Sequence, residues 1–131
     1  MQINMVGLST DQLDIMKEFY SQVLGFEITE ELESYVEFGG QPLRFALCDR
    51  KIMQQVTEDS NFNQRATGSP FELAFLCETR EELDGRYAEI IEKGARVVKE
   101  PTVMPWNHYT AFFADPDGYV HELFVKLESE G

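Results

Sequence analysis

Residues 114–124 read ADPDGYVHELF, and this stretch decides how the end of the chain folds. Its Asp115-Pro116-Asp117-Gly118 segment is typical of a tight turn, because proline presets its own backbone angle and glycine tolerates left-handed geometry. The turn joins two strand-like runs, residues 109–114 and residues 119–125, in which apolar side chains recur with a period of two. The stretch therefore predicts a β-hairpin.

The residues before this hairpin predict a strand, a helix and another strand. Residues 71–77 alternate between apolar and other side chains, and Thr79 is suited to begin a helix. The helix has one apolar stripe, a stop at Gly94 and a strand after it at residues 96–99. Its stripe consists of Leu83, Tyr87, Ile90 and Ile91. The second half of the chain is therefore a strand, a helix and three strands.

The first half repeats this order. We expect a strand at residues 3–8, a helix from about Asp11 to Leu24, and a helix stop at Gly25. Three strands follow, at residues 26–29, 34–38 and 43–48, with Gly39-Gly40 as the last turn. A βαβββ unit with one helix stripe is too small to be stable alone, so we expect the two units to share an interface, within the chain, between chains, or both.

Residues 50–70 separate the two repeats. They read RKIMQQVTEDSNFNQRATGSP, a polar segment without a sustained period, which indicates a linker or a lid with Met53, Phe62 and Asn63 as possible ligand contacts. We expect one domain over residues 1–131, with a first module at 1–49, this segment at 50–70, and a second module at 71–127.

The composition restricts the partners. A net charge of −13 and a pI near 4.4 argue against nucleic acid and anionic membrane surfaces. The sequence has no apolar run of the ~20 residues that a bilayer span needs, and its start lacks a signal-peptide pattern. We therefore expect a cytoplasmic protein. Cys48 and Cys77 lie in strand-like runs without metal-ligand spacing, so we expect reduced thiols and no structural zinc.

Two motifs carry a resemblance to a known family. Phe19-Tyr20 followed by Val23-Leu24-Gly25-Phe26 resembles the opening of the vicinal oxygen chelate superfamily, which includes glyoxalase I, bleomycin-resistance proteins, fosfomycin-resistance enzymes and extradiol dioxygenases. Residues 114–124 resemble the "DPDGnxxEL" ending of that family, and Pro105-Trp106 resembles the "PWG" that often precedes it. The match extends over nearly the whole chain.

The resemblance implies an α+β fold of paired βαβββ modules, in which a mixed sheet curls into an open cup with helices outside, usually in a homodimer. In metal-binding members the ion is held at the positions of Met5, Glu72 and Glu122. Met5 departs from the His or Gln that many such members have, and a thioether beside two carboxylates suits no single metal well. We expect no bound cofactor. The alternative is a divalent metal (Zn, Ni, Mn, Fe or Mg) on Glu72 and Glu122.

Strand alternation assigns the faces independently of the family. Glu72 and Glu122 interrupt apolar rows on the cup side, Met5 joins them there or is simply core, and His121 points away from the cup. Two neighbouring carboxylates raise each other's pKa unless a cation lies between them. That cation is a metal, a positively charged ligand, or Arg44, which follows Gly40 as Glu122 follows Gly118.

Aromatic side chains provide stacking platforms in the cup, or merely fill the core or a dimer interface. The candidate platforms are Phe45, Trp106, Tyr109, Phe112, Phe113 and Phe124, and we expect His108 to lie exposed in a turn. The expected ligand-binding residues are Met5, Arg44, Glu72, Trp106, Phe112, Glu122 and Phe124.

Two functions fit these residues. The first is a metal-free dimer resembling the bleomycin-resistance proteins, which sequesters a small cationic or aromatic compound in its cups. The alternative is a divalent-metal-dependent lyase of the glyoxalase kind, or a thiol transferase of the fosfomycin-resistance kind, with Glu122 as the catalytic residue or Glu72 in its place. A regulatory or scaffold module is a third interpretation. Fold alone does not decide among them, so whether the protein is an enzyme stays open here.

Overall fold

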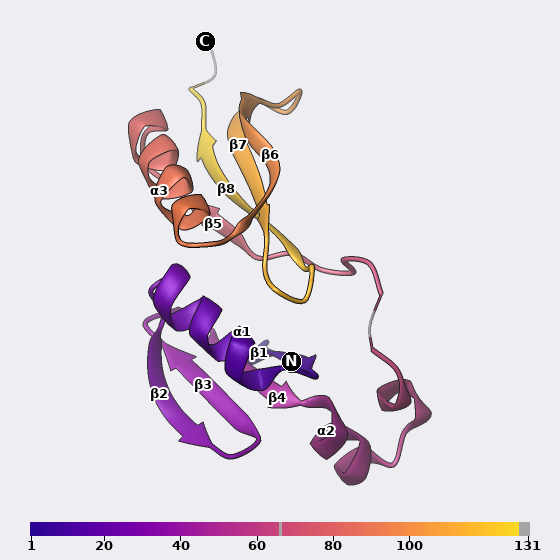
Figure 1. Ribbon diagram of the computed structural model, residues 1–131. Helices are drawn as coiled ribbons and strands as arrows, with labels where there is room; N and C mark the ends of the chain where they lie inside the picture. The colour runs from indigo at the N-terminus through magenta and orange to yellow at the C-terminus, as the bar shows by residue number, and fades with distance from the viewer. Residues whose placement is uncertain (66, 129–131) are drawn as a thin grey trace. The chain divides into compact units, whose positions relative to one another are not determined.

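The chain consists of two compact units with the same sheet topology, one up to residue 67 and one from residue 68. The computed structural model describes residues 1–65 and 67–128. Each unit has a four-stranded mixed sheet with a helix along one face, and the strand orders are β1-β4-β3-β2 and β5-β8-β7-β6 (Figure 1). The first and last strands of each unit pair in parallel, and the other pairs are antiparallel. The predicted α+β repeat is therefore confirmed.

The first unit follows the predicted order with shifted boundaries. Its elements are β1 (Met5–Thr10), α1 (Leu13–Glu18), the π-helix η1 (Phe19–Val23), β2 (Glu27–Leu32), β3 (Tyr35–Gly39) and β4 (Arg44–Asp49). The single helix predicted to end at Leu24 is thus an α-helix that continues into a π-helical turn. The predicted stop holds, because Gly25 has a φ of 78°, which side chains with a Cβ rarely adopt.

An aromatic cluster forms the core of the first unit. The ring of Tyr20 lies 5.0 Å from that of Phe45 and 6.1 Å from that of Phe38, and Phe26 contacts all three. Phe45 is only 4% exposed. Its proposed role as a ligand platform is therefore wrong: in β4 it points toward the helix, where it contributes packing within the unit.

Most of the segment between the repeats is folded, which the sequence interpretation missed. It forms α2 (Arg50–Thr57) and the 3-10 helix η2 (Ser60–Asn63). Asp49 caps α2 by accepting the backbone N–H of Lys51 at 2.8 Å. Arg50 donates to the carbonyl of Phe62 and, at 2.8 Å, to Oδ1 of Asp11, so the segment is tied to the first unit. Its role as a lid stays a prediction.

The second unit has one long helix and four strands. Its elements are β5 (Ala74–Leu76), α3 (Arg80–Glu92), β6 (Arg96–Val103), β7 (His108–Ala114) and β8 (Val120–Lys126). Thr79 begins α3 as predicted, because its Oγ1 accepts the N–H of Glu82 while the Glu82 carboxylate accepts the N–H of Glu78. Strand β6 is longer than expected and contains Pro101. An edge strand tolerates this proline, because one side of its backbone has no sheet partner.

The core of the second unit lies between α3 and its sheet. Leu83 of α3 and Phe113 of β7 are completely buried, and the ring of Phe113 stacks on that of Phe75 at 6.4 Å. Phe113 is therefore a core residue, and its expected role as a ligand platform is wrong, as it is for Phe45. Both Cys48 and Cys77 are free thiols, and Cys77 is buried.

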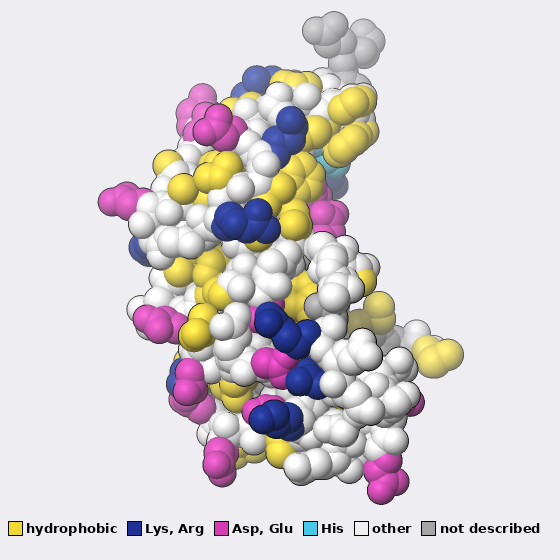
Figure 2. Space-filling view, turned by 45° about the vertical axis from the view of Figure 1, so that its right-hand side comes forward, with side chains coloured by type: hydrophobic (Ala, Val, Ile, Leu, Met, Phe, Trp, Pro, Cys, Tyr) yellow, Lys and Arg dark blue, Asp and Glu magenta, His cyan; other side chains and the backbone are white. Residues whose placement is uncertain are grey.

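Large apolar side chains also reach the surface of the second unit. Hydrophobic surface is visible on the face shown in Figure 2. The exposed residues of this kind are Leu76, Val97, Val98, Val103 and Trp106. Within the described parts of the chain, none of the helices has the length and apolar character needed to cross a membrane.

We predict that two leucines of the first sheet contribute differently to stability because one is buried and the other is exposed. Leu47→Ala removes a side chain that is completely buried and should lower the free energy of unfolding by about 2 to 5 kcal/mol, because a cavity replaces its contacts. Leu32→Ala is the matched control: Leu32 is 58% exposed, and the loss should stay below about 0.5 kcal/mol. Urea unfolding monitored by tyrosine fluorescence measures both. Equal losses would contradict the assignment of the core.

Candidate functional site

The candidate site lies on the face of the second sheet that α3 does not cover, which we call the open face. Alternation and strand register define this face. Its residues are Glu72, Ala74 and Leu76 next to β8, Val120, Glu122, Phe124 and Lys126 of β8, His108, Thr110, Phe112 and Ala114 of β7, and Arg96, Lys99 and Thr102 of the edge strand β6. Glu72 is exposed while Phe71 and Leu73 on either side are half-buried, so the predicted orientation of the first acid is confirmed.

Glu122 is the central acid of the open face. It is half-buried in β8, opposite Ala74 on one side and Phe112 on the other. Burial raises the pKa of its carboxyl, and the negative charge of Glu72 raises that pKa further. The repulsion expected between the two acids therefore acts on Glu122.

A buried histidine holds the backbone that carries Glu72. His121 is completely buried on the helix side of β8, as its strand position predicted. Its Nδ1 accepts the N–H of Leu73 at 3.1 Å, and its Nε2 lies 3.6 Å from Oδ2 of Asp115. The other oxygen of Asp115 accepts the N–H groups of Asp117 and Tyr119, which closes the turn. Asp115 and His121 thus hold the backbone of Leu73 against β8, which places Glu72 beside Glu122.

Aromatic side chains surround Glu122 on the open face. Phe112 and Phe124 are both half-buried, and the ring of Phe124 stacks on that of His108 at 5.2 Å. Trp106 is 57% exposed in the turn after β6. Phe112 and Phe124 therefore lie where the sequence placed them, and Trp106 is a solvent-exposed side chain of the neighbouring turn.

Two open-face residues were missed by the sequence interpretation, and one expected residue lies elsewhere. His108 belongs to β7 and is half-buried rather than exposed in a turn. Thr110 is completely buried, and its hydroxyl has no hydrogen-bond partner among the described residues. Strand alternation backward from Phe112 would have identified both, because residues 108, 110 and 112 lie on the same face of a strand. Tyr109 faces the helix instead, where its hydroxyl donates to Asp84 at 2.7 Å, so its role as an open-face platform is wrong.

The first unit brings Arg44 together with a carboxylate that the sequence interpretation did not name. Arg44 donates from Nη2 and Nε to the two oxygens of Glu37, at 2.6 and 3.1 Å, and from Nη1 to Asn4. The Tyr35 hydroxyl donates to Glu37 at 2.6 Å. Arg44 and then Tyr35 lower the pKa of Glu37 to about 2. Arg44 is therefore paired within its own unit.

Met5 belongs to the same group of side chains. It pairs in register with Arg44, and its sulfur lies 3.6 Å from the Tyr35 hydroxyl. Met5 is 40% exposed, so the interpretation as a core residue is wrong. Its thioether accepts a weak hydrogen bond on the surface of the first unit.

The donor set does not fit the metal centre that the resemblance implies. Among residues 1–65 and 67–128, no three His, Cys, Asp or Glu side chains form a group that could hold a metal ion. The implied set is two carboxylates, Glu72 and Glu122, and the thioether of Met5. Hard divalent ions favour the two carboxylates and gain little from the thioether.

The fold and the motifs now define the class of protein. Two βαβββ units with the same strand order, each carrying one half of the motif pair, are the fold implied by the sequence motifs. A family model described as Glyoxalase/Bleomycin resistance protein/Dioxygenase superfamily matches residues 2–123. The chain belongs to this superfamily.

Solved structures share the fold along almost the whole chain. A glyoxalase/bleomycin resistance protein/dioxygenase from Nocardioides is 25% identical with a TM-score of 0.89, and the match covers 98% of this chain and 85% of that one. A glyoxalase/bleomycin resistance protein/dioxygenase family enzyme from Burkholderia phytofirmans PsJN is 22% identical with a TM-score of 0.86, and the match covers 97% of this chain and 100% of that one. A lactoylglutathione lyase from Agrobacterium tumefaciens is 24% identical with a TM-score of 0.74, and the match covers 95% of this chain and 92% of that one. The search of curated proteins finds no match.

We predict an order of effects on the Glu37 carboxyl. Arg44→Gln should raise the pKa of Glu37 from about 2 toward the usual 4.5, and Tyr35→Phe should raise it less, because the Arg44 hydrogen bonds are the larger cause. NMR titration of the side-chain carboxyl carbon measures both variants. In the wild type, the stabilisation from this group is present above pH 4.5 and is lost as the pH falls through about 2. A larger effect of Tyr35→Phe would contradict this order.

We predict the opposite pH dependence for Glu122. Its pKa lies above the usual 4.5 in the folded protein, so the folded state binds this proton more tightly than the unfolded chain does. The free energy of unfolding therefore falls as the pH rises through the raised pKa. Glu122→Gln removes this loss, so the melting temperature of the variant relative to wild type should increase as the pH rises above the usual carboxyl pKa of 4.5. A difference that does not change with pH would refute the assignment.

Proposed function

We propose that the open face of the second unit binds a small cationic, aromatic compound, which a homodimer of this protein sequesters without changing it chemically. The observation that carries the proposal is Glu122, a half-buried carboxylate whose charged neighbour is another carboxylate, Glu72. The resemblance to bleomycin-resistance proteins points to the same class of function.

A cationic ligand would relieve the repulsion between the two acids. Within the described part of the second unit, neither Glu72 nor Glu122 forms an ion pair with a basic side chain. Arg44, the internal candidate, is already paired with Glu37. An external cation is therefore the expected partner, and the net charge of −13 favours its approach.

The aromatic surroundings favour a ligand with a flat ring system. Phe112 and Phe124 offer ring faces beside Glu122, and cation–π attraction adds to the charge pairing where water is excluded. Together these groups provide charge and stacking.

The second candidate function is the metal-dependent lyase or thiol transferase. The observation in its favour is also Glu122, because a carboxyl with a raised pKa is suited to proton transfer near neutral pH. The donor set described above favours the binding protein.

The test uses proflavine, a planar cationic dye, as the probe. We expect proflavine to raise the melting temperature and to bind with a measurable change in fluorescence polarisation. Glu122→Gln should weaken binding about tenfold, because a charge-assisted contact is lost. Glu33→Gln is the matched control: it removes the same charge from an exposed position of the first unit and should leave the affinity unchanged.

Three results would count against this function. One is the absence of binding by proflavine and by a wider panel of cationic aromatics. The second is equal weakening by Glu122→Gln and Glu33→Gln, which would show attraction to overall charge only. The third is one equivalent of divalent metal retained by the purified protein together with a lyase or transferase activity lost on chelation, which would establish the alternative.

A further inference from the structure

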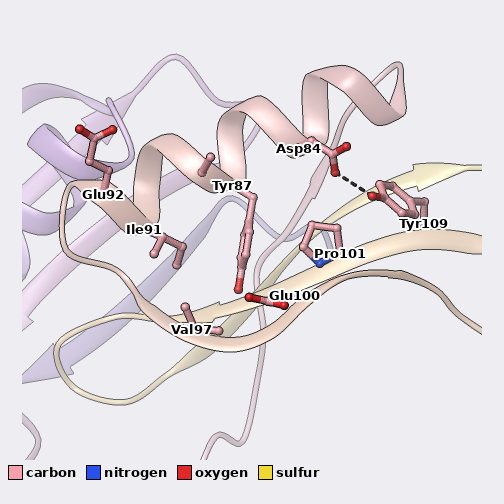
Figure 3. Close-up of a pocket in the computed structure, with 9 residues that line it drawn as sticks. Asp84, Tyr87, Ile91, Glu92, Val97, Glu100, Pro101 and Tyr109 are labelled. Atoms are coloured by element: carbon pink, nitrogen blue, oxygen red, sulfur yellow. Dashed lines mark hydrogen bonds between the residues drawn. The ribbon is translucent and has the colours of Figure 1, made fainter.

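The second unit has a groove on the opposite side of its sheet, between α3 and the edge strand β6. The hollow has a volume of about 630 Å³, within the range of small-molecule sites. Figure 3 shows Tyr87 extending from the helix toward β6, with Val97 and Ile91 to one side of it and Pro101 to the other. The groove shares none of its lining residues with the open face.

The groove exists because α3 does not cover the edge of the sheet. Val97 pairs in register with Phe113, so it lies on the helix side, yet 46% of its side chain is exposed. Register shifts follow at Lys99 and before Thr102, which bend β6 where the sheet would otherwise continue under the helix. Apolar surface is therefore left open along the groove, from Ile91 and Val97 to Pro101.

The polar lining of the groove is acidic. The three charged residues that line it are Asp84, Glu92 and Glu100. No Lys, Arg or His belongs to its described lining, and the guanidinium of Arg80 lies 4.9 Å from the centroid of the Tyr109 ring at the Asp84 end. Asp84 lies at one end, where its carboxylate accepts the Tyr109 hydroxyl, and Glu100 reaches beneath the ring of Tyr87 (Figure 3). Burial and then the charge of Glu100 raise the pKa of Tyr87, whose hydroxyl donates to the carbonyl of Phe112. Negative charges thus alternate with apolar surface.

The spacing of the acids distinguishes between possible cations. Asp84 and Glu92 are eight positions apart on α3, which is about 12 Å along the helix axis. Within the described residues no three acidic groups come close enough to hold a metal ion. A single compact ion could therefore not contact all three carboxylates at once, whereas an extended molecule with several positive charges could.

We propose that this groove binds a linear aliphatic polyamine. Its ammonium groups pair with Asp84 and Glu100, and with Glu92 when the chain is long enough, while its methylene segments lie on Ile91, Val97 and Pro101. The charge complementarity and the exposed apolar floor carry this assignment, and it does not depend on the function proposed for the open face.

Spermine is the probe for the test. In ¹⁵N-labelled protein we expect spermine to shift the amide signals of α3 and β6 at ~0.15 M salt, where loosely attracted counterions are largely screened. The double variant Asp84→Asn with Glu100→Gln should weaken binding about fivefold or more by calorimetry, because two charge contacts are lost. Both amides keep the shape of the groove, and asparagine still accepts the Tyr109 hydroxyl.

The matched control removes two exposed acids from the first unit, by Glu27→Gln with Glu33→Gln. This double variant has the same net charge as the groove variant and should bind spermine as the wild type does. Equal weakening by both double variants, shifts spread over all acidic surfaces, or equal binding of Mg²⁺ to the same amides would overturn the proposal. Glu122→Gln should leave the spermine-induced shifts of the α3 and β6 amides intact, so failure of the open-face site and failure of the groove are distinguishable.

Discussion

The parallel pairing of the first and last strands in each unit is the constraint on which both candidate sites depend. It places Met5 beside Arg44 in the first unit and Ala74 beside Glu122 in the second. Paired residues on neighbouring strands point to the same face of the sheet. One such pair therefore decides which side chains of the sheet face the helix and which face away. In the second unit, the N–H of Leu73 bound to His121 extends this pairing beyond β5 to the residue next to Glu72.

The two units use the same position in opposite ways. Arg44 and Glu122 both follow a glycine with positive φ by four residues, and both face away from the helix. In the first unit the neighbouring strand supplies Glu37, so Arg44, Glu37 and Tyr35 form a neutral group whose hydrogen bonds are satisfied. In the second unit the position that corresponds to Glu37 holds Thr110, Phe112 lies opposite Glu122, and the nearby charged group is Glu72. The first unit therefore holds a compensated ion pair at this position, whereas Glu122 forms no ion pair within the described residues.

Both faces of the second sheet carry carboxylates, but they differ in the surface around the acids. The open face surrounds Glu122 with ring faces, which suits a flat cation held by stacking. The groove beside α3 separates its carboxylates along the helix and offers aliphatic side chains between them. Charge alone would attract the same cations to both. The shape and the kind of apolar surface distinguish the two proposed ligands.

Local sequence patterns predicted the order of the elements within each repeat, the internal repeat, and the face on which Glu72, Glu122 and His121 lie. These follow from local periodicity and from turn residues such as Gly25 and Gly118, which act over a few positions of the chain. Only the tertiary structure decided that Arg44 pairs with Glu37, that Tyr109 bonds to Asp84, and that residues 50–57 fold as a helix tied to Asp11. Such contacts depend on strand register and on irregularities such as those in β6, which bring distant residues together without a local signal.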